Sequence, residues 1–229
     1  IGRLVGSEMC IRDSSRTMSV AQRLYESGHI TYMRTDSVSL SKDAMSSAQQ
    51  ITRSFGSHYC NPRKYQNKNK SAQEAHEAIR PTNFGLSSLD NDSPEDKLYK
   101  LIWRKTIASQ MSDAEIEKTT IEIGFEGISQ NFLSTGEVIK FDGFLKVYNL
   151  SSGKEGQSIL PNVNDGDLVN CVDVIATQKF SRPPARYTEA SLVKKLEDLG
   201  IGRPSTYAPT IKTVQDRGYV EIKDLEGVD

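Results

Sequence analysis

The spacing of apolar residues predicts helices in the first and last parts of the chain and strands between them. Apolar side chains recur at helical intervals in residues 15–28, 41–56, 72–81 and 93–111. Ser41 suits the N-cap position of the second of these helices, where its hydroxyl can accept a backbone N–H. The first half of the chain is therefore predicted to be mainly helical.

After residue 113 the pattern becomes that of strands. The segments KTTIEIGF (118–125), EVIKFDGFLKVYN (137–149) and LVNCVDVIAT (168–177) are rich in β-branched and aromatic residues. Gly, Asn, Asp and Ser separate them, and NDGD at 164–167 suits a turn because these residues tolerate left-handed backbone geometry. We expect an antiparallel β region here.

The last part of the chain returns to a helical pattern. Thr188 suits the start of one helix, which Gly200 ends, and Ser205 suits the start of a second, which Gly218 ends. The segment YVEI, residues 219–222, has the composition of a strand. Two short helices joined by a glycine turn and followed by a strand resemble a winged-helix or helix-turn-helix unit.

Composition narrows the class of protein. With 229 residues, the chain is long enough for one large domain or two to three small ones. No apolar run approaches the roughly 20 residues that a membrane span needs, so we expect no membrane association. The three cysteines, at positions 10, 60 and 171, form no CxxC pair. A reduced, cytoplasmic location is therefore expected.

Charge is unevenly distributed along the chain. The net charge is −1, but residues 1–110 hold 16 Lys and Arg against 11 Asp and Glu, whereas residues 111–182 hold 6 against 11. A protein that binds nucleic acid needs positive potential only where the phosphates lie. The basic first part is compatible with such a surface, and chance variation among small counts is the alternative.

The first dozen residues do not read as part of a fold. LVGSEMCIRDS, residues 4–14, has neither helical nor strand period, and position 1 is Ile. We treat residues 1–12 as a non-native leader and exclude them from fold reasoning. We expect the chain to be a fragment.

The segment ITYMRTDS, residues 30–37, raises the main chemical question. One interpretation is a strand that runs into a turn, with Tyr32 as an ordinary core residue. The other is a tyrosine nucleophile with Arg34 beside it, because residues two apart in extended chain project to the same face. A guanidinium there would favour the phenolate and would neutralise charge on a pentacovalent phosphate.

His76 lies in AQEAHEAIRPT, where His-Glu is the beginning of the zinc-protease motif. That motif needs a second histidine four residues later, and position 80 is Arg. The protease interpretation therefore fails. His76 suits either contact with an anion or a hydrogen-bonded place in the core.

The connection GIGRPST, residues 200–206, has features that suit phosphate. Arg203 is a two-pronged donor, while Ser205 and Thr206 would place hydroxyls and free backbone N–H groups at a helix N-terminus. An ordinary N-cap explains the same residues equally well. The spacing excludes a nucleotide-binding P-loop.

Taken together, these motifs resemble one family, the bacterial type IA DNA topoisomerases of the topoisomerase I branch. The similar segments follow one another in the family's order and cover nearly everything from Ser15 onward. They are GHITYMRTDSVSLS (28–41), SAQEAHEAIRPT (71–82), LYKLIWRKTIASQM (98–111), VIKFDGFLKV (138–147) and the long segment 183–220 that begins PPARYTEASL.

The resemblance implies roles for individual residues. Tyr32 matches the nucleophile that cuts one DNA strand and becomes joined to its 5′ phosphate, and Arg34 matches the arginine that contacts the scissile phosphate. His76 matches a histidine close to that site. Thr35 and Asp36 are expected to hold the segment in place. Positions that contact DNA beside the cleavage site are matched by Arg203, Thr206 and Arg217.

The resemblance also implies an α+β multidomain fold. Residues 13–112 would form a helical, winged-helix-like tyrosine domain, residues 113–182 part of a β-rich arch, and residues 183–229 the start of a second helical, winged-helix-like DNA-binding domain. The implied activity is ATP-independent relaxation of negatively supercoiled DNA by a monomer in the cytoplasm, associated with the nucleoid.

Some parts of the implied active site are missing from the chain. The family's Mg²⁺ ligands and its catalytic glutamate lie in a Toprim domain that this sequence lacks, so the chain alone is expected to be inactive. Two rival interpretations stay open. One is a DNA-binding module without catalysis, based on residues 183–220. The other is a recombinase, which would need Arg and His residues grouped around a late tyrosine, and no such group is present.

Overall fold

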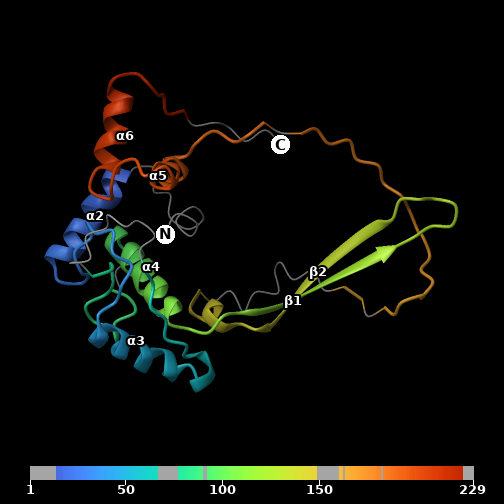
Figure 1. Ribbon diagram of the computed structural model, residues 1–229, viewed down its shortest axis with the longest axis horizontal. Coiled ribbons are helices and arrows are strands. Elements are labelled where there is room, and N and C mark those ends of the chain that lie inside the picture. Colours follow the sequence, from blue (N-terminus) through green and yellow to red (C-terminus); the bar gives the residue numbers. More distant parts are fainter. Residues whose placement is uncertain are drawn as a thin grey trace. The chain divides into compact units, whose positions relative to one another are not determined.

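The computed structural model describes residues 14–66, 77–89, 92–148, 160–161, 163–181 and 183–223. The chain divides into two compact units, one made of residues 1–110 and 186–229, the other of residues 111–185 (Figure 1). The first unit is helical, and the second contains an antiparallel pair of strands. The architecture is therefore mixed α and β, as the sequence predicts.

The first part of the helical unit contains α2 (Ser14–Glu26), α3 (Lys42–Ser54), the 3-10 turn η1 (Ser57–Tyr59) and α4 (Pro94–Ser109). α4 contacts both α2 and α3 (Figure 1). The Ser41 hydroxyl accepts the N–H of Ala44 at the start of α3. The Ser93 hydroxyl accepts the N–H of Asp96 at the start of α4. The three helices predicted for these stretches are confirmed, within a few residues at their ends.

The core of this unit lies along α4. Tyr99 is fully buried, and its hydroxyl donates to the carbonyls of Asn83 and Leu86, at 3.1 and 2.7 Å. Trp103 donates its indole N–H to the carbonyl of Phe84 at 2.8 Å. These bonds fasten an irregular segment onto α4, which explains how a loop without regular structure is held in place. Other buried apolar side chains of this unit are Val20, Leu24, Ile30, Met33, Leu98 and Ile107.

Two shorter helices, α5 (Glu189–Asp198) and α6 (Tyr207–Asp216), complete the helical unit. Thr188 and Ser191 form a reciprocal capping box at the start of α5, so the predicted cap is confirmed. The predicted cap of α6 is wrong. Thr206, not Ser205, is its N-cap, and the Thr206 hydroxyl accepts the N–H of Arg203 at 2.8 Å instead of an N–H of the helix.

The winged-helix prediction finds no support after α6. Within described residues 219–223 no strand forms, although YVEI has a strand-like composition. Tyr219 and Ile222 are both exposed. A strand needs a neighbour to receive its backbone hydrogen bonds, and none of the described residues pairs with this segment.

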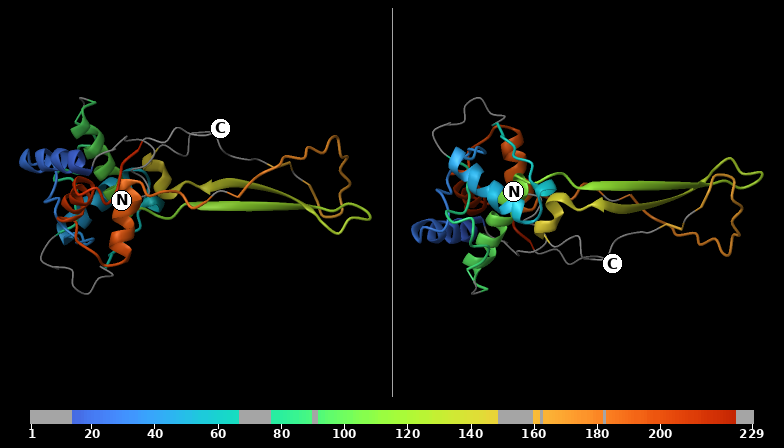
Figure 2. Two further views of the ribbon diagram at one scale, coloured as in Figure 1. Left: turned by 90° about the horizontal axis from the view of Figure 1, so that it is seen from above. Right: turned by 90° about the horizontal axis from the view of Figure 1, so that it is seen from below.

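The second unit contains an antiparallel ribbon of β1 (Glu115–Ile123) and β2 (Phe132–Phe141), seen in Figure 2. The register pairs Ile123 with Phe132 at one end and Glu115 with Phe141 at the other. A β-bulge lies between Glu115 and Ile116. The antiparallel prediction is confirmed for these two strands.

The sequence pattern predicted strand over 137–149, which is wrong beyond Phe141. A 3-10 helix, η2 (Gly143–Tyr148), follows the strand directly. Gly143 has a φ of 48°, and a Cβ there would collide with the backbone of Asp113. The strand therefore ends where glycine both adopts a left-handed conformation and permits close approach of two chain segments.

The third predicted strand, residues 168–177, is also wrong. These residues form no strand, and Leu168, Val172 and Ile175 are almost completely exposed. β-branched composition favours a strand only when a partner strand and a packing surface are present, and no described residue supplies either.

Candidate active site

Residues 30–41, the tyrosine segment, show an alternating pattern of burial. Met33, Thr35 and Ser37 are buried, whereas the side chains between them are turned outward. Tyr32 is 40% exposed and Arg34 is exposed as well. The alternation is that of extended chain, so Tyr32 and Arg34 lie on the same outer face.

The Tyr32 ring lies against α2. Its centroid is 5.3 Å from that of Tyr25, and the two rings meet edge to face at 69°. Tyr25 belongs to α2 and is 41% exposed. Tyr25 therefore serves as a partner for the Tyr32 ring at the edge of the core.

The buried side of the tyrosine segment is held by its own hydroxyl groups. The Thr35 hydroxyl accepts the N–H of Ser37 at 3.0 Å, and the Ser37 hydroxyl accepts the N–H of Ser39 at 3.3 Å. These local bonds satisfy backbone donors that neither a helix nor a sheet would satisfy here.

Arg34 and Asp36 have different surroundings. Within the described part of the chain, no hydrogen bond or ion pair engages the Arg34 guanidinium, which leaves it open to an anion. Asp36 pairs with Arg203, whose Nη1 lies 3.2 Å from its Oδ2. This ion pair joins the tyrosine segment to the loop that precedes α6.

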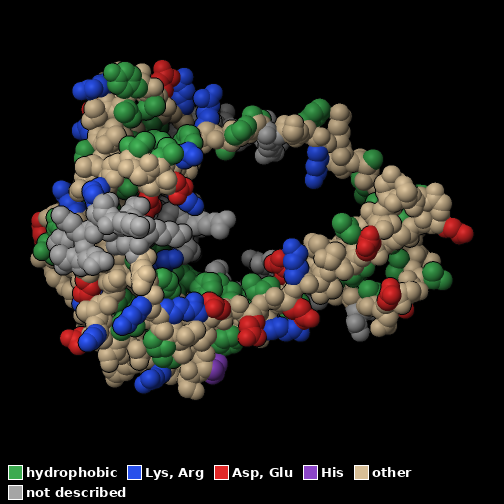
Figure 3. Space-filling model, viewed as in Figure 1, with side chains coloured by type: hydrophobic (Ala, Val, Ile, Leu, Met, Phe, Trp, Pro, Cys, Tyr) green, Lys and Arg blue, Asp and Glu red, His purple; other side chains and the backbone are tan. Residues whose placement is uncertain are grey.

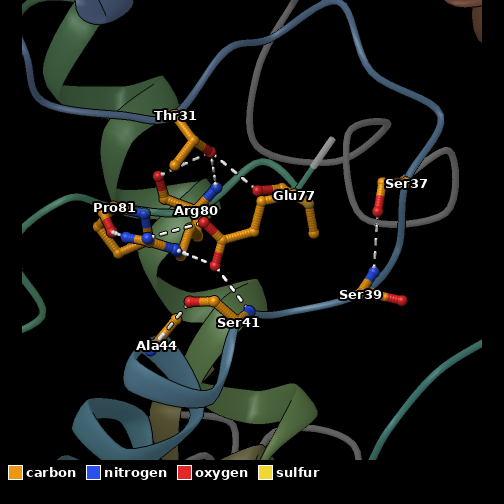
Figure 4. Close-up of polar contacts among 9 residues, drawn as sticks. Thr31, Ser37, Ser39, Ser41, Ala44, Glu77, Arg80 and Pro81 are labelled. Carbon is orange, nitrogen blue, oxygen red and sulfur yellow. Dashed lines mark hydrogen bonds and ion pairs between the residues drawn. The ribbon is translucent and has the colours of Figure 1, made fainter. Parts of the chain in front are cut away.

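Both ends of the tyrosine segment are bound to one short stretch, residues 77–82 (Figure 4). At the first end, Ile30 and Pro81 form an antiparallel bridge, and the N–H of Thr31 donates to the carbonyl of Arg80 at 3.0 Å. At the second end, the N–H of Ala78 donates to the carbonyl of Ser39 at 2.9 Å. Residues 32–38 are thereby fixed on both sides.

The helix predicted for residues 72–81 is wrong over its described part, 77–81, which is not helical. Arg80 precedes a proline, which disfavours the helical conformation. Pairing with the tyrosine segment then supplies the backbone hydrogen bonds that a helix would have made.

Glu77 and Arg80 form the centre of this arrangement. The Nε and Nη2 of Arg80 each donate to a different oxygen of Glu77, both at 2.8 Å. The N–H of Ser41 donates to the same carboxylate at 2.8 Å. Burial raises the pKa of Glu77, but the bonds from Arg80 and Ser41 outweigh it and lower the pKa below the ordinary value. The carboxylate is therefore ionised at neutral pH.

Sequence reasoning missed Glu77 and used Arg80 only to exclude a zinc site. The available signal was their spacing of three residues, although on a helix that spacing suggests only an exposed ion pair. His76, the predicted neighbour of the cleavage site, lies outside the described residues.

The predicted phosphate contacts of the second group are placed at both ends of α6. Arg203, Ser205 and Thr206 precede the helix and are exposed, while Arg217 follows it. A helix of ten residues rises about 15 Å. The structure thus brings Arg203 to the tyrosine segment, through Asp36, but leaves Arg217 at the far end of α6.

Charges do not gather into one patch on the face shown in Figure 3, where Lys and Arg are interspersed with Asp and Glu. Among the described residues, no group of three or more His, Cys, Asp or Glu side chains could hold a metal ion. No described helix is long and apolar enough to cross a lipid bilayer.

Comparison with known proteins identifies related sequences over almost the whole chain. A family model described as DNA topoisomerase matches residues 10–228. DNA topoisomerase 1 of Mycolicibacterium smegmatis is 49% identical over 230 residues, which cover 92% of this chain and 24% of that protein. DNA topoisomerase 1 of Zymomonas mobilis is also 49% identical, over 92% of this chain and 18% of its own length.

A solved structure resembles the fold as well. Full-length topoisomerase I from Thermotoga maritima superimposes with a TM-score of 0.67 and 35% sequence identity. The match covers 90% of this chain and 35% of that protein. The chain thus spans about a quarter of the length of the M. smegmatis relative and about a third of the T. maritima protein.

Proposed function

We propose, since the chain belongs to the family of bacterial type IA DNA topoisomerases, that it carries the nucleophile for cutting and resealing one DNA strand. The observation that supports this most directly is the placement of Tyr32 and Arg34. Both are exposed on one face of a segment that is fixed at both ends. A nucleophile needs such a placement, because reacting groups must be held in a defined geometry.

The proposed reaction consists of two transesterifications. The Tyr32 oxygen forms a bond to phosphorus while the bond from phosphorus to the 3′ oxygen breaks. The phenol gives up its proton, and the departing 3′ oxygen takes one. The 5′ phosphate stays attached to Tyr32 until the 3′ hydroxyl attacks and reverses the exchange. The phosphodiester bond energy is conserved, so ATP is not required.

Arg34 is proposed to stabilise the negative charge that develops on the phosphate during each exchange. It lies two residues from Tyr32 on the same face, and no described residue competes for its guanidinium. A donor aimed at developing charge accelerates the chemical step more than it strengthens binding.

Other parts of the site are expected outside this chain. The described residues offer no metal cluster, so we derive no step through Mg²⁺. The Mg²⁺ ligands and the proton donor for the 3′ oxygen are expected in a Toprim domain. The chain alone is therefore proposed to bind single-stranded DNA weakly and not to cleave it. Contacts to the DNA backbone are proposed for His76, Arg203, Ser205, Thr206 and Arg217.

The working state is proposed to be a monomer in the cytoplasm, associated with the nucleoid. Relaxation of negatively supercoiled DNA would follow when the other strand passes through the cut before religation. Domain limits at residues 112 and 182 belong to the same proposal.

The test uses a completed enzyme, meaning this chain joined to the segments of the M. smegmatis relative that it does not cover. The completed enzyme is expected to relax a negatively supercoiled plasmid and to form a covalent adduct with single-stranded DNA. Tyr32→Phe removes one hydroxyl and should abolish the adduct while DNA binding stays within about twofold, because a single hydroxyl makes up little of the contact energy.

Tyr25→Phe is the matched control. It removes the same atom from the ring that contacts Tyr32 and should leave cleavage unchanged. An adduct formed by the Tyr32→Phe variant would exclude Tyr32 as the nucleophile. DNA binding without any adduct in the completed enzyme would favour the rival function, a DNA-binding module without catalysis.

A further inference from the structure

We propose that Glu77 and Arg80 are positioning residues that set the place of Tyr32 relative to the scissile phosphate. The inference rests on the proposed function, because the position of Tyr32 matters only if Tyr32 attacks. Neither residue is presented to solvent as a DNA contact would be, since the Arg80 and Glu77 side chains are only 17% and 24% exposed.

The backbone of Arg80 holds Thr31 in place. Its backbone N–H donates to the Thr31 hydroxyl at 2.9 Å, and its carbonyl accepts the N–H of Thr31 at 3.0 Å. The Thr31 hydroxyl also donates to the carbonyl of Ala78 at 2.8 Å. Thr31 is the residue directly before Tyr32, so the backbone that carries the phenol is fixed by Arg80 on one side (Figure 4).

The Glu77 carboxylate holds the other end of the tyrosine segment. One carboxylate oxygen accepts both the Nε of Arg80 and the N–H of Ser41, each at 2.8 Å. Ser41 ends the tyrosine segment and caps α3. The carboxylate therefore ties the far end of the segment to the same arginine whose backbone holds the near end.

The Arg80 guanidinium is itself held by several contacts. Besides its two bonds to Glu77, the guanidinium donates to the carbonyl of Pro81 at 3.0 Å and lies 5.7 Å from the centroid of the Phe84 ring. Phe84 is buried, and its carbonyl is bonded to Trp103 of α4. The Arg80 guanidinium thus links the tyrosine segment to the core of the helical unit.

The consequence concerns rate more than binding. Loss of the pair would leave Tyr32 on the surface, able to meet DNA, but without a defined distance to the phosphorus. A misplacement of about 1 Å can cost roughly 100-fold in rate. Weakening the pair is therefore expected to lower cleavage at saturating DNA while affinity changes little.

The experiment compares variants of the completed enzyme in single-turnover cleavage of an oligonucleotide at saturating concentration. Glu77→Gln keeps the size and one acceptor oxygen but replaces the other oxygen with a donor that cannot accept from Arg80. We expect cleavage to slow between about 10- and 100-fold, with DNA affinity within about twofold. Glu77→Asp keeps the charge but shortens the reach, and it should lie between Gln and the wild type.

Asp96→Asn is the matched control for stability. Asp96 is a buried carboxylate of the same helical unit, bonded to Leu89, Ser88 and Lys100 and not to the tyrosine segment. We expect this variant to melt earlier while its folded fraction cleaves at the normal rate. A merely structural role for Glu77 would make cleavage in Glu77→Gln follow the melting temperature as it does in Asp96→Asn.

A second measurement does not depend on activity. In the 229-residue chain, hydrogen exchange at the N–H of Thr31 should speed up about 10-fold or more in Glu77→Gln, because its partner Arg80 is released. Unchanged cleavage in both Glu77 variants, or unchanged exchange at Thr31, would overturn the inference. An adduct in Tyr32→Phe would instead overturn the proposed function, whatever the Glu77 variants do.

Discussion

Residues 30–41 and residues 167–181 both lack helix and regular strand, yet their surroundings differ completely. In the first segment buried and exposed side chains alternate, whereas every described side chain from 167 to 181 is exposed. Ile30 is 1% exposed and Ile175 is 82% exposed. The same residue type therefore contributes to the core in one segment and nothing to it in the other.

The difference lies in the partner segment. Residues 77–82 give the tyrosine segment backbone hydrogen bonds at both ends, and the Ile30 and Met33 side chains of the segment are buried. No described residue does either for residues 167–181. Irregular chain thus becomes a rigid platform when a second segment satisfies its backbone groups, and local sequence alone does not achieve this.

The largest expected effect tests whether the fixed segment is the catalytic one. In the completed enzyme, Arg34→Ala should slow cleavage at saturating DNA by about 10²–10³-fold, since it removes a donor aimed at developing charge. Affinity should change little, because Arg34 is proposed to be only one of several phosphate contacts. Lys179→Ala removes an exposed cation from the other segment and should alter cleavage less than about twofold. A large affinity loss with normal cleavage in Arg34→Ala would contradict its assigned role.

The next largest expected effect is a loss of stability when Asp96, near the start of α4, is replaced. Asp96 is fully buried, and burial raises its pKa, but Lys100 at 2.6 Å and the N–H of Leu89 outweigh this and lower the pKa below 3.8. Asp96→Asn should cost about 2 kcal/mol of stability at neutral pH, as expected for a hydrogen bond to a charged group.

The pH dependence of that cost has a defined sign. A carboxylate with a lowered pKa stabilises the folded state above its unfolded pKa, and this contribution is lost as the pH falls through the folded pKa. The gap between wild type and Asp96→Asn should therefore be constant near neutral pH and shrink below pH 3.8. Urea unfolding followed by the fluorescence of Trp103, the single tryptophan, measures it. A gap that widens in acid would contradict the assignment.

The smallest expected effect is a difference in stability between two Ile→Val substitutions, one in each segment. Ile30→Val should destabilise the helical unit by about 1 kcal/mol, because it removes a buried methylene. Ile175→Val should stay within about 0.5 kcal/mol, as is usual for surface positions. The midpoint of urea unfolding, again read from Trp103, separates the two. Equal losses would show that residues 167–181 are packed in solution.

Local signals in the sequence predicted the helices well. Ser41, Ser93 and Thr188 each accept a backbone N–H from a residue three positions later. The residue that starts each helix therefore lies directly before it in the sequence. Ser205 is also a residue type that favours the N-cap position. At α6, however, the Thr206 hydroxyl accepts the N–H of Arg203, and no side chain caps the helix.

Signals that depend on distant partners failed. Residues 77–81 have helical periodicity, and their non-helical conformation comes from pairing with residues 30 and 31, about 50 positions away. Val172 and Ile175 were predicted to lie in a strand because they are β-branched. Composition cannot reveal that no described residue pairs with them. The outward face shared by Tyr32 and Arg34 followed from a spacing of two, which is a local signal.

The ion pair between Asp36 and Arg203 would make the proposed phosphate binding at Arg203 an exchange of anions. A phosphate that binds the Nη1 of Arg203 would compete with the Asp36 carboxylate, whose Oδ2 lies 3.2 Å away. The gain is then the difference between two similar attractions, and cations attracted to the freed carboxylate offset part of the counterion release from the DNA. The exchange would remove one link between the tyrosine segment and the loop before α6. The Arg203 guanidinium would have an anionic partner in both cases, a carboxylate without DNA and a phosphate with it.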